Sequence, residues 1–309
     1  MTPPTPASVT SPAGRPSTAL LTDKYELTMI RAALADGTAD RPCVFEVFAR
    51  RLPAGRRYGV VGGTGRLMER LADFRFTEAE IEALGDSLDD RTVEWLRDFR
   101  FTGDIDGYRE GELFFPGSPV LTVRGGFAEC VVLETLVLSV LNHDSAVASA
   151  AARMTSAADG RPIIEMGSRR THEEAAVAAA RAAYLTGFAA TSNVEATRRH
   201  GVPSAGTSAH SFTLLYAGPG GPDEAAAFRA QVHALGTDTT LLVDTYDITQ
   251  GVATAIEVAG PELGGVRIDS GDLGVLARPV RAQLDSLGAH RTRIVLSGDL
   301  DEHAIAALR

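Results

Sequence analysis

The feature that most constrains the fold is a regular alternation of short apolar runs and alanine-rich runs that begins near residue 160. Such alternation is typical of βαβ units, in which parallel strands are joined by helices. The runs that predict strands are residues 162–166, 187–191, 203–207, 240–244, 266–269 and 293–296. The runs that predict helices are residues 172–184, 222–235, 248–258 and 273–287. This pattern fits either a doubly wound sheet or an incomplete β/α barrel.

The chain before this alternation has a mixed pattern that predicts a separate α+β domain over residues 19–160. Two strand-like runs, 104–108 and 120–123, are separated by prolines and glycine, which favours antiparallel pairing. The sequence T-E-A-E from Thr77 is a capping-box pattern, so a helix is expected to begin there. Further helices are predicted over 23–35, 63–73, 90–99 and 128–154, and a further strand over 43–49.

The two ends of the chain have unusual compositions. Residues 1–18 hold five of the fifteen prolines and one charge, at Arg15, so they predict a disordered tail without the apolar region of a signal peptide. The last nine residues begin with Asp301 as a helix cap and contain no terminating glycine or proline. We therefore expect the chain to end inside a domain, with residues 161–309 holding about six of the eight strands of a barrel.

Composition argues against several classes of protein. The 309 residues carry 30 basic and 40 acidic side chains, a net charge of −10, which gives no positive field for nucleic acid. The longest strongly apolar stretch, 130–141, is shorter than the ~20 residues that cross a bilayer, so no membrane segment is expected. Cys43 and Cys130 match no disulfide framework or zinc motif, which favours a cytoplasmic protein.

Polar side chains collect where the predicted strands end, and in a barrel these ends share one site. Arginines there suit a phosphate or a carboxylate, and carboxylates among hydroxyl groups suit ribose or Mg²⁺. A phosphorylated sugar and a metal are therefore expected. Each residue type also has a simpler explanation, because adjacent arginines can form surface ion pairs, a histidine can be packed, and Asp247 or Asp301 can cap a helix.

Six segments resemble the nicotinate phosphoribosyltransferase family, in the same order along the chain. They are LLTDKYELTM (20–29), GSRRTH (167–172), TSNVEA (191–196), GVPSAGTSAHSF (201–212), LLVDTYDITQGV (241–252) and GVRIDSGDL (265–273). The combination of GTSAHSF, VDTYD and RIDSGDL is the most specific part of the match. The resemblance implies an α/β protein in which an N-terminal α+β domain precedes an irregular TIM-like β/α barrel of the type II phosphoribosyltransferase kind.

The family joins nicotinate to 5-phosphoribosyl-1-pyrophosphate, forming nicotinate mononucleotide and pyrophosphate for NAD salvage, with coupled ATP hydrolysis and Mg²⁺. The resemblance implies that ATP phosphorylates His210 and that Asp244 orients this histidine. A neutral imidazole is a competent nucleophile toward a γ-phosphoryl group, and a carboxylate can hold it in place. The metal ligands are left unassigned.

The resemblance also implies which residues bind substrate. Arg267 and Asp269 match residues near the nicotinate, the pyrophosphate and the ribose hydroxyls. Arg169 and Arg170 are candidates for the phosphates or the nicotinate carboxylate, in either assignment. Tyr25 matches an aromatic residue that stacks on the pyridine ring from the partner subunit, which implies a homodimer, although a packed helix tyrosine is the simpler explanation from the residues alone. The remaining candidates are Ser192, Asn193, Thr207, Ser211 and Ser270.

Three alternatives remain. Nicotinamide phosphoribosyltransferase places an aspartate near its amide, whereas residues 190–193 contain no carboxylate, so the anionic nicotinate is favoured. Quinolinate phosphoribosyltransferase uses neither ATP nor a phosphohistidine, so the GTSAHSF segment argues against it. The third is a non-catalytic or inactive fragment that keeps the fold, because the last two strand–loop units of a barrel commonly bind phosphate and would follow Arg309.

Overall fold

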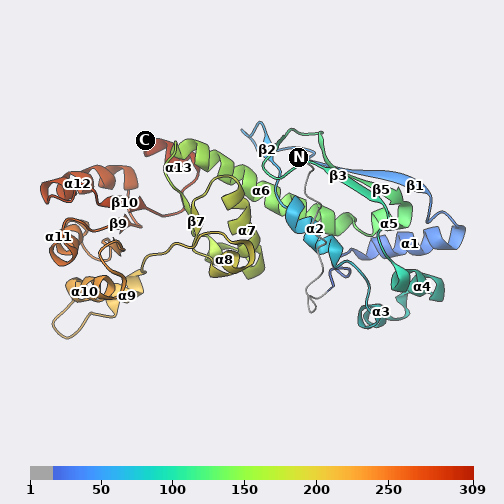
Figure 1. The fold of residues 1–309 in the computed structure, drawn as a ribbon, viewed down its shortest axis with the longest axis horizontal. Coiled ribbons are helices and arrows are strands. Elements are labelled where there is room, and N and C mark those ends of the chain that lie inside the picture. Colours follow the sequence, from blue (N-terminus) through green and yellow to red (C-terminus); the bar gives the residue numbers. More distant parts are fainter. Residues whose placement is uncertain (1–16) are drawn as a thin grey trace, which may run out of the picture. The chain divides into compact units, whose positions relative to one another are not determined.

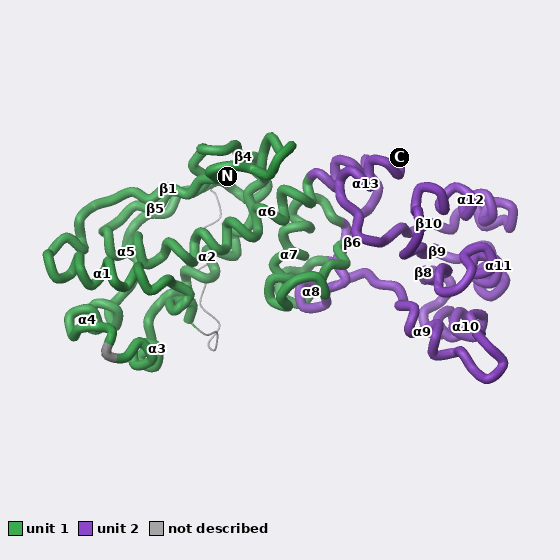
Figure 2. The backbone as a smooth tube through the Cα atoms, turned by 180° about the vertical axis from the view of Figure 1, so that it is seen from behind, with its two compact units in different colours: residues 1–152, 165–188, 198–202 green, residues 153–164, 189–197, 203–309 purple. Residues whose placement is uncertain are grey.

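The computed structural model describes residues 17–309, except for the side chain of Asp86. The chain forms two compact units, coloured separately in Figure 2. Unit 1 comprises Met1–Ala152, Glu165–Phe188 and Arg198–Val202, and unit 2 comprises Arg153–Ile164, Ala189–Thr197 and Pro203–Arg309. The units interleave along the chain, whereas the sequence predicted a single boundary between residues 160 and 161.

A buried ion pair explains why residues 165–188 belong to unit 1. Helix α7 (Glu173–Leu185) carries Arg181, whose guanidinium donates two hydrogen bonds of 2.7 Å to the Glu110 carboxylate. The two side chains are only 17% and 15% exposed. Periodicity could not reveal this contact, because it joins residues 71 positions apart.

The predicted tail over residues 1–18 lies outside the described residues except for Ser17 and Thr18. Thr18 is buried, and its hydroxyl donates a hydrogen bond of 2.9 Å to the Arg70 carbonyl. The tail prediction therefore does not hold for Thr18, because this hydroxyl is anchored to the end of a helix.

Unit 1 is built on an antiparallel sheet with helices packed against it (Figure 1). The strand order is β1 (Pro42–Phe48), β5 (Pro119–Gly126) and β3 (Asp104–Gly107), and the predicted antiparallel pairing of β3 with β5 is confirmed. The other elements before β5 are α1 (Lys24–Asp36), β2 (Gly59–Val60), α2 (Thr64–Ala72), α3 (Glu78–Leu84), α4 (Asp90–Asp98) and β4 (Leu113–Phe114). Thr77 forms the predicted capping box with Glu80 at the start of α3.

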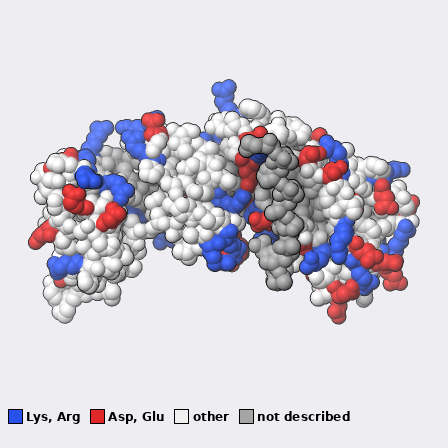
Figure 3. All heavy atoms as spheres, viewed as in Figure 1, with Lys and Arg blue, Asp and Glu red and all other residues white. Residues whose placement is uncertain are grey.

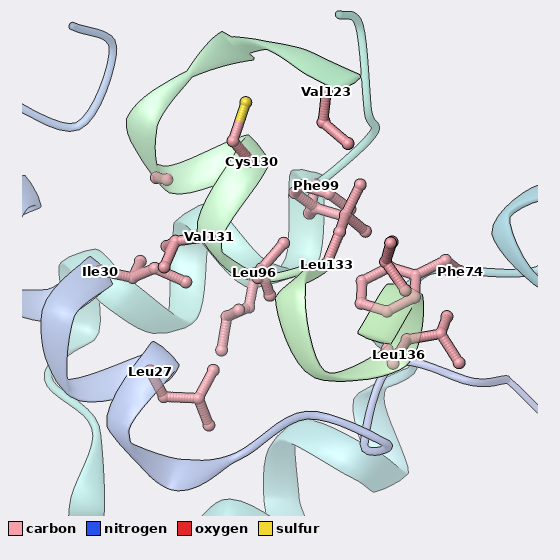
Figure 4. Close-up of a cluster of buried hydrophobic side chains, with 14 of the residues drawn as sticks. Leu27, Ile30, Phe74, Leu96, Phe99, Val123, Cys130, Val131, Leu133 and Leu136 are labelled. Carbon is pink, nitrogen blue, oxygen red and sulfur yellow. The ribbon is translucent and has the colours of Figure 1, made fainter. Parts of the chain in front are cut away.

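The core of unit 1 lies between α1, α4 and the helices that follow β5, namely α5 (Phe127–Val131) and α6 (Glu134–Ala158). Ile30 on α1 and Leu96 on α4 belong to the same cluster as Val131 and Leu133 (Figure 4). All four side chains are at most 1% exposed. Because burial of apolar surface is the main favourable term in folding, this cluster holds the helices to one another.

The helical stretch Phe127–Ala158 is 32 residues long. It is the one stretch in the described part of the chain whose length and apolar composition would allow it to cross a membrane. Half of its most apolar window is buried inside the structure, as in the core helix of a globular protein. The helix is interrupted at Val132 and Leu133, between α5 and α6, whereas the sequence predicted one continuous helix over 128–154. The absence of a membrane segment stays a prediction.

Unit 2 contains the predicted βαβ pattern. Its parallel sheet has the order β10 (Arg293–Leu296), β9 (Gly265–Ile268) and β8 (Thr240–Leu242). Helix α10 (Glu224–Leu235) precedes β8, α11 (Ile248–Ala259) joins β8 to β9, and α12 (Leu273–Ser286) joins β9 to β10. The strand order has no reversal, so right-handed crossovers place α11 and α12 on the same face of the sheet (Figures 1 and 2). These three strands therefore lack the reversal that defines a doubly wound sheet.

Aspartate caps explain where the helices of unit 2 begin. The side chains of Asp223, Asp247, Asp272 and Asp301 each accept a hydrogen bond from a backbone N–H in the first turn that follows. The prediction that Asp247 and Asp301 are caps is confirmed, with Asp301 preceding α13 (Glu302–Ala307).

Three strands predicted at the start of the alternation differ from expectation. Residues 162–166 and 187–191 yield only β6 (Ile164–Glu165) and β7 (Ala190–Thr191), which form a two-stranded sheet. The strand predicted over 203–207 is wrong, because only Ser204 forms an isolated bridge, with Thr191. Pro203 has no N–H to donate to a ladder, which disfavours a continuous strand. The mixed α/β class is confirmed, and a barrel stays a prediction.

Figure 3 shows the charged side chains on one face of the molecule. Acidic and basic groups are interspersed over the described part of this face, and no continuous basic band is visible there.

Candidate functional site

The site is centred on His210, which the sequence placed on a loop and which instead begins helix α9 (His210–Leu214). Its Nε2 lies 3.1 Å from Oδ1 of Asp244, two residues after the end of β8. The Asp244 side chain is 1% exposed, whereas that of His210 is 39% exposed. A buried carboxylate therefore holds a half-exposed imidazole by one nitrogen, and no bond to Nδ1 is present among residues 17–309.

The second oxygen of Asp244 fixes the orientation of the carboxylate. Oδ2 accepts hydrogen bonds from the backbone N–H of Asp269, at 2.8 Å, and from the hydroxyl of Ser270, at 2.7 Å. Because both donors follow β9, the ends of two neighbouring parallel strands are joined through this carboxylate. The Asp244 carboxylate is therefore held where it can balance a positive charge on the imidazole.

Arg267, the third residue of β9, is the centre of a second network. Its guanidinium donates to the hydroxyls of Ser297 and Thr207, at 2.7 and 2.9 Å, and to the Ser208 carbonyl at 3.3 Å. A fourth bond, of 2.5 Å, goes to Asp269 Oδ1. The side chain is 14% exposed, so this fork of donors connects three loops in a largely water-free place.

Asp269 is ionised at neutral pH. Burial tends to raise its pKa, but hydrogen bonds from the Ser297 hydroxyl and the Arg267 guanidinium, together with the charges of Arg267 and His210, hold the pKa below its usual value. The site thus combines two carboxylates, one guanidinium and one imidazole. Such a set can bind an anionic group at the guanidinium and hydroxyl groups at the carboxylates.

The structure brings together six of the predicted site residues of unit 2 by hydrogen bonds, namely His210, Asp244, Thr207, Arg267, Asp269 and Ser270. Ser211 follows His210 in α9 and is exposed. Ser192 and Asn193 follow β7 instead, where the Asn193 amide oxygen accepts from the Ala196 N–H at the start of α8 (Val194–His200).

The other three predicted residues belong to unit 1. Tyr25 on α1 is 46% exposed, and its hydroxyl donates a hydrogen bond of 2.8 Å to Glu134 at the start of α6. That bond raises the pKa of Tyr25. Arg169 and Arg170 lie in a 3₁₀ turn (Ser168–Arg170), and both are exposed.

Ser297 lies among the polar residues at the predicted strand ends, but the sequence did not single it out as a candidate site residue. This residue follows β10, accepts from Arg267 and donates to Asp269, so it closes the second network. The signal was present in the repeated sequence S-G-D-L at 270–273 and 297–300, which puts a serine at the ends of two adjacent parallel strands.

The residues of the site do not form a ready-made metal centre. No group of three His, Cys, Asp or Glu side chains able to hold a metal is present in the described part of the chain. Asp244 and Asp269 are already occupied by protein donors. Magnesium commonly binds through one or two carboxylates together with substrate phosphates. These residues therefore fit a metal that arrives with a phosphorylated substrate better than a resident metal.

Comparison with known proteins agrees with the resemblance seen in the sequence. A family model described as the nicotinate phosphoribosyltransferase N-terminal domain matches residues 20–142. Nicotinate phosphoribosyltransferase pncB1 of Mycobacterium tuberculosis is 72% identical over 293 residues, which cover 94% of this chain and 65% of that protein. The Bacillus subtilis nicotinate phosphoribosyltransferase is 38% identical, with 95% of this chain and 60% of that protein covered. The chain thus spans less than two thirds of these curated relatives.

Among solved structures, the crystal structure of human nicotinic acid phosphoribosyltransferase matches with a TM-score of 0.81 and 31% sequence identity. The match covers 92% of this chain and 69% of the human one. Both units therefore fall within the region of similarity.

Proposed function

Because the chain belongs to the nicotinate phosphoribosyltransferase family, we propose that it acts in joining nicotinate to 5-phosphoribosyl-1-pyrophosphate, with coupled hydrolysis of ATP. The products would be nicotinate mononucleotide and pyrophosphate. The observation that carries the proposal is the His210–Asp244 pair. Nε2 of the imidazole lies 3.1 Å from Oδ1 of Asp244, and Nδ1 is left to act as a nucleophile.

In the proposed ATP step, Nδ1 of His210 is the nucleophile. The Asp244 carboxylate accepts a hydrogen bond from Nε2–H, and this tautomer keeps the lone pair on Nδ1. This lone pair attacks the γ-phosphorus of ATP, the bond from the γ-phosphorus to the bridging oxygen breaks, and ADP leaves with the electron pair. The phosphorylated ring carries a positive charge that the buried Asp244 carboxylate stabilises, and water later hydrolyses the N–P bond.

The network around Arg267 is suited to the other substrate. We infer that the guanidinium binds the pyrophosphate or the nicotinate carboxylate, and that Asp269 binds ribose hydroxyls, with Thr207, Ser211 and Ser270 lining the same place. In the structure Asp269 is the anionic partner of Arg267, so an incoming anion would replace it and free its carboxylate. Mg²⁺ would enter with the pyrophosphate.

Nicotinate is preferred to nicotinamide in this proposal. The segment 190–193, which contains Ser192 and Asn193, has no carboxylate that would repel an anionic substrate. Arg169 and Arg170 are the further candidates for its carboxylate or for a phosphate.

The finer architecture is also proposed. The β8–β9–β10 sheet, wound without reversal, would form part of an irregular TIM-like barrel of the type II phosphoribosyltransferase kind. The exposed Tyr25 ring would stack on the pyridine ring in the site of a partner subunit, so a homodimer is proposed. The absence of an arrangement for disulfides favours the cytoplasm.

The experiment is to incubate the 309-residue chain with nicotinate, phosphoribosyl pyrophosphate, ATP and Mg²⁺. Formation of nicotinate mononucleotide together with an acid-labile phosphate label that is lost in His210→Ala would support the whole proposal. Label without mononucleotide would support the ATP half and make this chain a fragment that lacks transferase activity. A label that persists in His210→Ala would overturn the phosphohistidine assignment.

A further inference from the structure

A carboxyl group beside the His210–Asp244 pair takes no part in the networks described above. Glu224 is the first residue of α10, and its Oε1 is buried without a hydrogen-bond partner. A Cβ atom at Gly251 would lie 3.3 Å from Oε2 of Glu224 and 2.4 Å from the carbonyl oxygen of Val243. Gly251 therefore lets α11 approach the Val243 carbonyl closely, and the Glu224 carboxyl lies against the same glycine.

The groups around Glu224 are mostly acidic. Asp244 approaches from the end of β8 and Asp247 from the cap of α11. On its own helix, Asp223 caps α10 and lies 3.8 Å from Arg229, so that cation is shared with another acid. Helix α9 also packs against α10, and its titratable residue His210 is hydrogen-bonded to Asp244. Glu224 itself forms no ion pair in the described part of the chain.

These surroundings allow Glu224 to change its charge near neutral pH. Burial, followed by the negative charges of Asp244 and Asp247, raises the pKa of Glu224 to about 7. The carboxyl is neutral below this value, and it adds a second negative charge next to Asp244 above it.

We propose that Glu224 is a positioning residue for the phosphohistidine step, which acts through Asp244 by setting the negative charge beside the His210 imidazole. The inference rests on the function proposed above. Phosphorylation at Nδ1 makes the ring positive, so an ionised Glu224 favours the phosphorylated state and a neutral one does not. Glu224 forms no covalent bond in this step, and it exchanges its proton with solvent.

The test compares the initial rate of acid-labile labelling by ATP in the parent and in Glu224→Gln, at pH 6 and at pH 8. At pH 6 both carry a neutral group at residue 224, so the rates should agree within about twofold. At pH 8 the variant should be slower by about fivefold, because it lacks the second negative charge. Glu224→Asp should recover part of the difference. Asp223→Asn, an exposed cap on the same helix, should show no such dependence on pH.

A second measurement does not need ATP. With ¹³C-labelled glutamate, the carboxyl signal that disappears in Glu224→Gln should titrate near neutral pH. An equal rate ratio at pH 6 and pH 8, or a Glu224 signal that titrates near the ordinary value of about 4.3, would overturn the role of Glu224. Absence of label on the parent at both pH values would instead contradict the ATP step, and the Glu224 titration would still decide whether this carboxyl changes its charge near neutral pH.

Discussion

The carboxylate of Glu26 accepts hydrogen bonds from both the backbone N–H and the hydroxyl of Thr135, at 2.9 and 2.6 Å. This contact joins α1 to the first turn of α6 within unit 1. Glu26 is 0% exposed, and its Oε2 has no hydrogen-bond partner. Burial raises the pKa of Glu26, opposed by the hydrogen bonds from Thr135. The folded protein therefore favours the protonated form more than the unfolded chain does.

We expect Glu26→Gln to change how stability depends on pH. A raised pKa contributes stability below the pKa of the unfolded chain, and this contribution is lost as pH rises through the folded value. The amide cannot ionise, so the variant does not lose this contribution. Its free energy of unfolding should therefore increase relative to that of the parent from pH 4 to pH 8. Urea unfolding followed by circular dichroism measures this. Glu82→Gln, at an exposed position of α3, is the control, and a difference between Glu26→Gln and the parent that is constant over this range would contradict the prediction.

Much of unit 2 could be predicted from the sequence because its signals are local. The aspartate caps and the apolar runs of β8, β9 and β10 lie in the sequence itself, and together they define the βαβ units. The co-location of Asp244 with Asp269 and Ser270 was also predictable, since the carboxyl ends of parallel strands share one edge of a sheet. The functional roles of these residues stay predictions.

The remaining features depend on contacts between distant residues or on very short elements. The two-residue strands β2 and β4 are too short to show a period, and Pro203 interrupts a run that otherwise resembles a strand. The place of Glu224 depends on the close approach of α11 at Gly251. This close approach cannot be read from a single segment of the sequence.

The ion pair between Arg181 and Glu110 should contribute strongly to the stability of unit 1. Arg181→Ala leaves a mostly buried carboxylate without its partner, which costs about 3 kcal/mol in the free energy of unfolding. Arg181→Lys keeps the charge but loses the two-fold hydrogen bond, so an intermediate loss is expected. Arg97→Ala removes an exposed ion pair with Glu78 and should cost much less than Arg181→Ala, because solvent screens the two charges. Equal losses for Arg181→Ala and Arg97→Ala in urea unfolding would be inconsistent with this account.

The same pair predicts a loss of stability in acid. Burial tends to raise the pKa of Glu110, but the hydrogen bonds and charge of Arg181 bring it below the usual value. A lowered pKa contributes stability above the unfolded value of about 4.3, and this is lost as pH falls through the folded value. Arg181→Ala should therefore weaken the acid dependence of unfolding between about pH 5 and pH 3. A variant with the acid profile of the parent would argue against this role.

Removal of the Ser297 hydroxyl should weaken binding of phosphoribosyl pyrophosphate. Ser297→Ala takes away the acceptor of Arg267 Nε and a donor to Asp269, so the guanidinium loses part of its support. Loss of hydrogen bonds to charged groups costs about 1.5–3 kcal/mol each in stability or binding, and a decrease in affinity of about tenfold is expected by calorimetry. Ser286→Ala, whose hydroxyl donates to the Gln283 carbonyl at the end of α12, is the matched control. Equal affinities of the two variants would contradict the role of Ser297.

Asp244→Asn tests whether the buried carboxylate is what makes His210 a nucleophile. The carboxylate accepts from Asp269, Ser270 and the imidazole, whereas an amide has only one acceptor oxygen. An amide nitrogen facing Nε2 would favour the wrong tautomer, and an amide could not balance the charge of the phosphorylated ring. Labelling of His210 by ATP should fall by up to roughly 10⁴-fold, as expected for a histidine that loses the carboxylate orienting it. Asp272→Asn, which can keep its cap oxygen on α12, should leave labelling within about twofold of the parent, and a similar small effect of Asp244→Asn would show that the pair is only structural.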